Sequence, residues 1–245
     1  MAERTVLVTG GTGGLGGAVS AAFLEAGWRV VVPEREGGTA AAAGPVRVRR
    51  QPQPGASDAT QRPEAVAADL LDPAGVAAAI AAATAEPAAP LRAVVNLVGG
   101  YASGGLVHET PIEEFDRMLR INLRPTYLVT QAALPHLVAA GGGAVVSVSA
   151  RAAVAPFPGA AGYATAKAAV QAFANAVAVE YRQRGVRSNT VLPSVIDTPA
   201  NRAAQPDADH GRWVPPAEIA AVIRFLASDE SAPTSGASIP VYGRA

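Results

Sequence analysis

The chain of 245 residues contains no cysteine. This absence excludes disulfide bonds, thiol nucleophiles and metal sites built from thiolates. Histidine is also scarce: His108, His136 and His210 are scattered along the chain and lack the spacing of metal ligands. We therefore expect neither thiol chemistry nor a metal centre.

The chain also lacks an excess of charge of either sign, because 20 basic side chains balance 20 acidic ones. Proteins that grip nucleic acid or anionic lipid are usually basic. No apolar run approaches the ~18 residues that cross a bilayer, and the first residues do not have the pattern of a signal peptide. These absences predict a cytoplasmic protein that binds a small-molecule substrate, and neither nucleic acid nor membrane.

Lysine is nearly absent, and the one lysine of the chain, Lys167, follows Tyr163 by four residues. The pair lies in an alanine-rich run over residues 162–180 that contains no proline, as expected of a helix. Side chains four apart share a helix face, so the phenol and the ammonium would lie together. A cation within ~4–6 Å lowers a phenol pKa toward the range of acid–base catalysis. The pair indicates such chemistry, although this spacing alone is more often a packing tyrosine beside a solvated lysine.

Glycine is concentrated near the N-terminus, where six of the eight residues 10–17 are glycine. Residues 5–9 before them are apolar and β-branched, as in a buried parallel strand. Residues 18–26 after them suit a helix that Gly27 would end. In the order strand, glycine turn, helix, such glycines let the backbone approach a pyrophosphate at the helix N-terminus. The stretch therefore predicts a nucleotide-binding site.

A second strand-like run, over residues 28–32, ends just before Glu34 and Arg35. An acid at this point of a dinucleotide-binding fold hydrogen-bonds the adenosine ribose and repels a 2′-phosphate. Glu34 therefore favours NAD(H). Arg35 could instead receive a 2′-phosphate, which leaves NADP(H) open, and the two residues could also be solvated loop charges.

The remainder of the chain alternates between strand and helix patterns. Strands are predicted over 65–70, 93–98, 144–149, 186–192 and 237–241, and helices over 73–85, 111–140, 162–180 and 216–227. This alternation predicts one domain over residues 1–245, with a parallel sheet covered on both faces. Residues 36–63 have the composition of an exposed, partly disordered loop, and residues 200–215 are polar and irregular, as a substrate lid is.

Taken in order, these residues resemble the short-chain dehydrogenase/reductase family over essentially the whole chain. The matching motifs are Thr9-Gly10-x-x-x-Gly14-x-Gly16, Asp69, Asn96-x-x-Gly99, Asn122 and Tyr163-x-x-x-Lys167. The resemblance implies a single Rossmann-fold α/β domain with a doubly wound, seven-stranded parallel sheet in the order 3-2-1-4-5-6-7. It also implies NAD(H) or NADP(H) as cofactor, and a homodimer or homotetramer formed through the helices that carry Asn122 and Tyr163.

The same resemblance implies a role for each matching residue. Tyr163 would be the general acid/base, Lys167 would bind the nicotinamide ribose and lower the tyrosine pKa, and Asn122 would hold a water in a proton relay. The residues expected to bind the cofactor are Gly10, Thr12, Gly14, Leu15, Gly16, Glu34, Arg35, Asp69, Leu70, Asn96, Val98, Gly99, Tyr163, Lys167, Val195 and Thr198.

One position departs from the family pattern. The family usually has a serine thirteen residues before the tyrosine, where it hydrogen-bonds the substrate oxygen, but here that position is Ala150. Strand alternation would turn Ser149 to the opposite face, although a bulge could bring it to the substrate. Ser149 is therefore a candidate catalytic residue.

A narrower resemblance, to dihydropteridine reductases, covers residues 98–105, 150–153, 192–215 and 235–237. Those enzymes also carry alanine at this position, and a quinonoid pterin does not need a serine to polarise a carbonyl. We expect an oxidoreductase that transfers hydride between nicotinamide and a small carbonyl, imine or quinonoid, pterin-like substrate. Two alternatives are a non-redox dehydratase, isomerase or cyclase on the same scaffold, and a nucleotide-sensing module.

Overall fold

A seven-stranded sheet forms the centre of the protein, in a computed structural model that describes residues 3–35 and 62–244. Every neighbouring pair of strands is parallel, and the order is β3-β2-β1-β4-β5-β6-β7. The strands are β1 (Thr5–Thr9), β2 (Arg29–Glu34), β3 (Glu64–Ala67), β4 (Leu91–Asn96), β5 (Gly143–Val148), β6 (Val186–Pro193) and β7 (Ser238–Val241). The predicted doubly wound fold and its strand order are confirmed.

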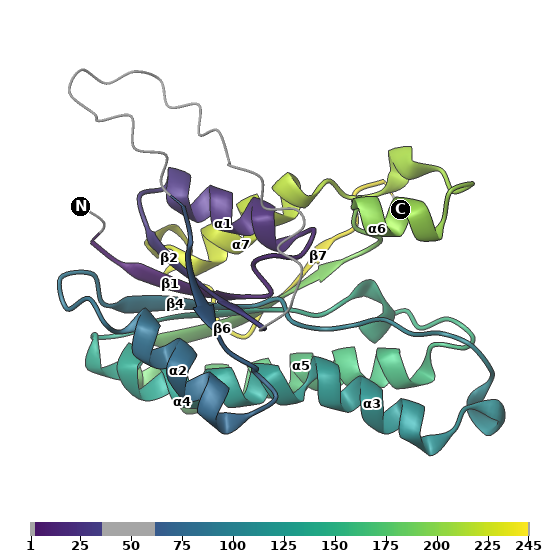
Figure 1. The fold of residues 1–245 in the computed structure, drawn as a ribbon, viewed down its shortest axis with the longest axis horizontal. Helices are drawn as coiled ribbons and strands as arrows, with labels where there is room; N and C mark the ends of the chain where they lie inside the picture. The colour runs from purple at the N-terminus through teal and green to yellow at the C-terminus, as the bar shows by residue number, and fades with distance from the viewer. Residues whose placement is uncertain (1–2, 36–61, 245) are drawn as a thin grey trace.

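Helices cover both faces of this sheet (Figure 1). One face carries α1 (Gly16–Glu25) and α7 (Pro216–Ala227). The other face carries α2 (Pro73–Ala83), α4 (Arg124–Ala139) and α5 (Ala161–Glu180), with α3 (Ile112–Asn122) packed against α5. A short helix, α6 (Pro199–Ala204), follows β6. Within the described residues, none of the helices is long and apolar enough to cross a bilayer.

Alternate residues of the central strands supply the two layers of the core. Val6 and Val8 pack in the layer of α1 and α7, whereas Leu7 between them packs in the layer of α2 and α4. This division follows from the two-residue period of a strand. A strand that is buried on both faces needs apolar residues throughout, which explains the continuous run in β1.

Two predicted elements differ from the structure. The helix expected over residues 111–140 is two helices, because α3 ends at Asn122 and α4 restarts at Arg124 with Pro125 in its first turn. Proline lacks the N–H that a continuous helix would use, so it favours a new helix start. The segment expected to be irregular, 200–215, contains most of α6 and a 3-10 turn at His210–Arg212. The loop predicted over 36–63 lies outside the described residues, apart from its last two.

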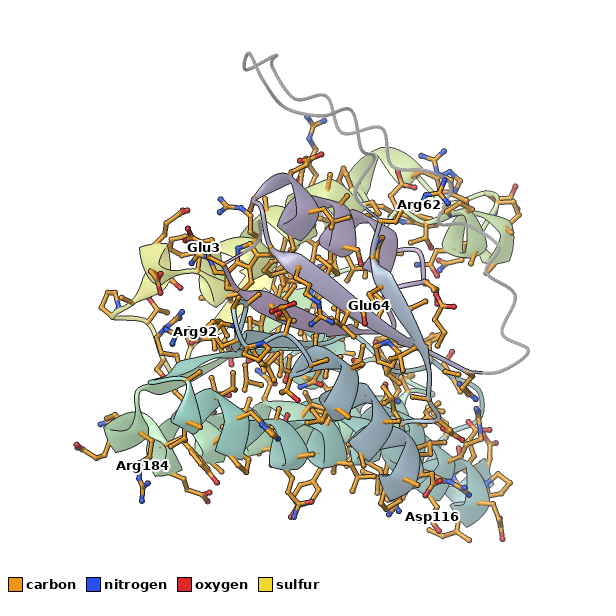
Figure 2. The ribbon with its side chains drawn as sticks, turned by 60° about the vertical axis from the view of Figure 1, so that its left-hand side comes forward. Glu3, Arg62, Glu64, Arg92, Asp116 and Arg184 are labelled. Atoms are coloured by element: carbon orange, nitrogen blue, oxygen red, sulfur yellow. The ribbon has the colours of Figure 1, made fainter. Side chains whose placement is uncertain are left out.

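One edge of the sheet is the short strand β3, which carries a charged residue. Figure 2 shows Glu64 on β3, where its carboxylate pairs with Arg29 of the adjacent strand β2. The Arg29 guanidinium also donates to the carbonyls of Ala82 and Ala83 at the end of α2 (3.0 and 3.4 Å). Short, charged edge strands discourage pairing with other chains. This network also fastens the edge of the sheet to the helix that covers it.

The carboxyl ends of all seven strands point to one edge of the sheet, because the strands are parallel. The strand order reverses between β1 and β4, since the chain completes β3 on one side of β1 and enters β4 on the other. In open α/β sheets, ligands bind in the crevice outside this switch point. The glycine turn after β1 and the loop after β4 both lie there.

Candidate active site

The glycine turn after β1 is a tight main-chain loop at the start of α1. The N–H of Gly13 donates to the carbonyl of Gly10 (3.0 Å), and Gly10 has a φ of 69°. A Cβ on Gly16 would collide with that carbonyl oxygen, so only glycine fits there. Helix α1 starts at Gly16 without a side-chain cap, and the N–H of Gly17 in its first turn donates to the carbonyl of Gly13 (3.2 Å), so the turn and the helix N-terminus form one main-chain unit at which an anion can bind. The turn therefore fits the pyrophosphate of a dinucleotide.

The loop after β6 approaches this turn from the other side. A Cβ on Gly14 would lie 2.7 Å from Cγ2 of Thr198, so the two predicted cofactor-binding residues are neighbours. The Thr198 hydroxyl caps α6 by accepting from the N–H of Asn201 (3.2 Å). The carbonyl of Val195 accepts from the N–H of Val214 (2.9 Å). These bonds fasten the segment 200–215 to the loop that carries Val195 and Thr198.

The residues predicted to bind adenosine follow β2 and β3. Glu34 ends β2 half-buried, and Arg35 is exposed directly after it. Asp69 is exposed and Leu70 is buried. The N–H of Ala68 donates to the Glu34 carbonyl (2.8 Å), which holds the two loops side by side. The structure thus brings these four residues to one place, and their contact with adenosine stays a prediction.

Asn96, at the end of β4, joins two strands and a helix. Its Nδ2 donates to Oγ1 of Thr130 on α4 (3.0 Å) and to Oγ of Ser147 on β5 (3.4 Å). Asn96 therefore links β4 to β5 and to α4. Its Oδ1 has no partner among the described residues. Beside it, the Thr9 hydroxyl accepts from main-chain N–H groups that follow β4, including that of Val98 (3.4 Å).

Gly99 and Gly100 let the chain pass directly against Asn122 and Lys167. A Cβ on Gly99 would lie 2.5 Å from Asn122 Oδ1 and 3.1 Å from Lys167 Nζ. Asn122 accepts from the N–H of Gly100 (3.2 Å) and donates to its carbonyl (3.0 Å). It also donates to the carbonyl of Met118 (3.0 Å). Both N–H donors of the side-chain amide are therefore engaged by main chain, its oxygen accepts one hydrogen bond, and its place in a water relay stays a prediction.

Tyr163 and Lys167 lie on the same face of α5, as their spacing predicts. The Lys167 Nζ is 6.0 Å from the centre of the Tyr163 ring. It donates to the carbonyl of Val148 at the end of β5 (3.1 Å). Burial lowers the pKa of Lys167 to about 8. Burial, together with the nearby phenol of Tyr101, raises the pKa of Tyr163 to about 12.

In the polypeptide alone, the pKa of Tyr163 is therefore shifted upward, opposite to the direction that the sequence predicts. The ammonium was expected to lower it, but the loss of water around the phenol outweighs a cation at this distance. A phenol with a pKa of about 12 is protonated at neutral pH. That is the form able to donate a proton to a substrate that is being reduced.

Ser149 and Ala150 occupy the place where the family pattern has its serine. The Ser149 hydroxyl donates to the carbonyl of Lys167 (2.8 Å), and the side chain is buried. Ala150 packs with Ala164 and Tyr163, so position 150 is the one on the tyrosine side. This agrees with the predicted alternation. The Ser149 hydroxyl could donate to a substrate oxygen only if its present hydrogen bond broke, and that role stays a prediction.

Two features of the site were not identified from the sequence. The ring of Tyr101 meets the ring of Tyr163 edge-on, with centroids 5.1 Å apart and planes at 85°. An aromatic residue directly after the Gly99-Gly100 pair was the available signal for this contact. The second feature is the Val148 carbonyl that receives Lys167. A main-chain acceptor leaves no signal in the residue types.

Known proteins are similar to this chain over nearly its whole length. The family described as short chain dehydrogenase matches residues 4–209. The 2-(R)-hydroxypropyl-CoM dehydrogenase of Xanthobacter autotrophicus is 32% identical, over 98% of this chain and 98% of its own. The D-threitol dehydrogenase of Mycolicibacterium smegmatis is 33% identical, over 98% of this chain and 92% of its own.

A solved structure agrees with these relatives. The short-chain type dehydrogenase/reductase from Mycobacterium ulcerans superimposes with a TM-score of 0.84 at 26% identity, and the match covers 100% of this chain and 90% of that one. None of these three proteins is named as a dihydropteridine reductase, so that narrower resemblance stays a prediction.

Two adjacent glycines test the pyrophosphate cradle. Gly16→Ala should weaken the binding of nicotinamide dinucleotide ~10-fold or more, because the new methyl group displaces the turn. Gly17→Ala is the matched control, since a Cβ there meets no atom within 4 Å. It should keep affinity and stabilise α1 by ~0.5–1 kcal/mol. Fluorescence titration and thermal denaturation measure both effects. Equal affinities in the two variants would show that the turn does not hold the dinucleotide.

Lys167→Met should raise the free energy of unfolding at pH 7 by about 2 kcal/mol. Burial lowers the lysine pKa from 10.5 to about 8, and each pKa unit costs the folded protein ~1.4 kcal/mol, a cost that methionine removes. The hydrogen bond to Val148 is lost in the variant, which offsets about 1 kcal/mol of this gain. Between pH 8 and 10.5 the unfolded chain binds more protons at this lysine than the folded protein does. The wild type should therefore gain stability with rising pH, and the difference should shrink.

Urea denaturation of both proteins at pH 7 and at pH 10 measures this difference. An equal difference at the two pH values would mean that Lys167 is not a desolvated cation.

Proposed function

Because the chain belongs to the short-chain dehydrogenase/reductase family, we propose that it transfers hydride between a nicotinamide dinucleotide and a small carbonyl, imine or quinonoid substrate. The family match supports an oxidoreductase that uses NAD(H) or NADP(H). The observation that carries the proposal is the placement of Tyr163 and Lys167 on one face of α5, with Lys167 beside Asn122 and the glycines that follow β4.

The protein would bind and orient the cofactor and the substrate, and one of its side chains would supply a proton. The glycine turn and the first N–H groups of α1 would hold the pyrophosphate, and Val195 and Thr198 would hold the nicotinamide end. The nicotinamide supplies or accepts the hydride. Tyr163, protonated at neutral pH, donates its proton to the substrate oxygen or nitrogen during reduction. Lys167 would bind the nicotinamide ribose while its carbon stem stays buried.

The preferred cofactor is NAD(H) on this proposal. Glu34 ends β2 at the position where a carboxylate hydrogen-bonds ribose hydroxyls and repels a 2′-phosphate. Arg35 is exposed immediately after it, so it is available to a 2′-phosphate as well. The two dissociation constants, measured side by side, decide between the cofactors.

The preferred substrate is a ring that can be reduced without a serine hydroxyl at position 150. Ala150 has no polar side-chain atom, and the hydroxyl of Ser149 is bound to the Lys167 carbonyl. These two observations favour a quinonoid, pterin-like substrate over a simple ketone. They also favour the second candidate, a non-redox dehydratase, isomerase or cyclase. Such an enzyme reduces no carbonyl, so it does not need a serine hydroxyl to polarise one.

Tyr163→Phe should lower turnover at least ~100-fold, the usual scale for the loss of a general acid. Binding of the dinucleotide should be unchanged, because the ring remains. Tyr181→Phe, at the other end of α5, is the matched control and should behave as wild type. The assay follows the absorbance of reduced nicotinamide with a quinonoid dihydropterin and with a panel of ketones.

Near-wild-type turnover of Tyr163→Phe would reject the assigned acid. Product formation without any change in nicotinamide absorbance would instead favour the non-redox candidate.

The protein should also form a homodimer or homotetramer through α4 and α5. Tyr127 on α4 is 46% exposed and Val179 on α5 is 68% exposed, although both are apolar. The Tyr127 ring lies 5.2 Å from that of Phe173, so the exposed apolar surface spans both helices. A second copy would remove this surface from water. Light scattering at micromolar concentration measures the assembly, and a monomer would contradict it.

A further inference from the structure

The groups nearest Tyr163 leave its substrate with few hydrogen-bond partners. Ala150 has none to offer, and the Ser149 hydroxyl is bound to the carbonyl of Lys167. The amide of Asn122 is taken up by Gly100 and Met118. A substrate atom that receives a proton from Tyr163 therefore needs its second partner from elsewhere.

Tyr101 and Ser103 carry two hydroxyls on the loop whose Tyr101 ring packs against Tyr163. The Tyr101 ring contacts the Tyr163 ring edge-on at 5.1 Å, and its hydroxyl is 2.6 Å from Oγ of Ser103. When the phenol donates to Ser103, the serine retains its own proton for another acceptor; the reverse arrangement frees the phenol. Tyr101 is 59% exposed, whereas the adjacent Tyr163 is half-buried. The pair is therefore accessible to a ligand.

The loop that carries these hydroxyls is fixed at both ends. On the N-terminal side, Asn122 holds both the N–H and the carbonyl of Gly100, the residue before Tyr101. On the C-terminal side, the N–H of Gly104 donates to the carbonyl of Gly159 (2.9 Å). A Cβ on Gly159 would collide with the carbonyl of Gly104, so the two segments touch closely. Groups held in this way cost little ordering entropy when a substrate binds.

We propose that the Tyr101–Ser103 hydroxyl pair supplies the second hydrogen bond to the substrate atom that Tyr163 protonates, in place of the serine that position 150 lacks. The inference rests on the proposed function, because it concerns the same reacting atom. It assigns a substrate-binding role to Tyr101 and Ser103. The inference also restricts the substrate, because its reacting oxygen or nitrogen must lie on the Tyr101 side of the Tyr163 ring.

The test compares Tyr101→Phe with a double variant, Ala150→Ser with Tyr101→Phe. Tyr101→Phe keeps the ring and its contact with Tyr163, and should lower kcat/KM ~10-fold, the scale of one hydrogen bond. The dissociation constant of the dinucleotide should not change. Ala150→Ser returns a hydroxyl to the tyrosine side of the site, so the double variant should recover most of the loss. Ser103→Ala, which removes only the partner hydroxyl, should cause a smaller loss than Tyr101→Phe.

Each other outcome overturns the inference. Wild-type kcat/KM in Tyr101→Phe would show that the phenol does not bind the reacting atom. A loss that Ala150→Ser fails to recover, in a double variant that binds the dinucleotide normally, would show that the hydroxyl acts on the loop alone. Tyr163→Phe, assayed in parallel, tests the proposed function separately, since only that variant removes the proton donor.

Discussion

The two hydrogen bonds between Asn122 and Gly100 are the contact on which the site depends. They join the end of β4 to the end of α3, and they are possible because Gly99 and Gly100 carry no side chain. Lys167 enters the same place from α5 and is held by the carbonyl that ends β5. Three strand–helix units therefore converge on one pair of glycines. Any side chain at position 99 would separate the groups that the chemistry needs together.

Much of the fold could be predicted, because its signals are local. The β-branched runs, the glycine turn and the four-residue spacing of Tyr163 and Lys167 each report one element at one place. The break between α3 and α4 was harder to place, since Pro125 tolerates either a kink or a new helix start. The helical turns within 200–215 depend on caps and on the bridge between Ile196 and Val214, which sequence periodicity does not register.

The candidate site was predictable in its residues and less so in its electrostatics. Tyr163, Lys167 and Asn122 lie where the ordered motifs imply, but the pKa of Tyr163 moves upward instead of downward. The expectation weighed only the charge of the lysine, whereas burial acts on both groups and opposes ionisation of each. The contact with Tyr101 depends on how two loops meet across Gly104 and Gly159, and no short motif reports such a contact.

The burial of Lys167 has a consequence for chemical labelling. It is the chain's one lysine, and its side chain is 6% exposed. Reagents that modify side-chain amines therefore have a single lysine target, which the folded protein shields. The pKa of about 8 belongs to the buried amine, and an amine that an opening exposes to water regains its ordinary pKa of ~10.4. The rate of its acylation thus reports how often α5 separates from β5, and a bound dinucleotide should slow that reaction.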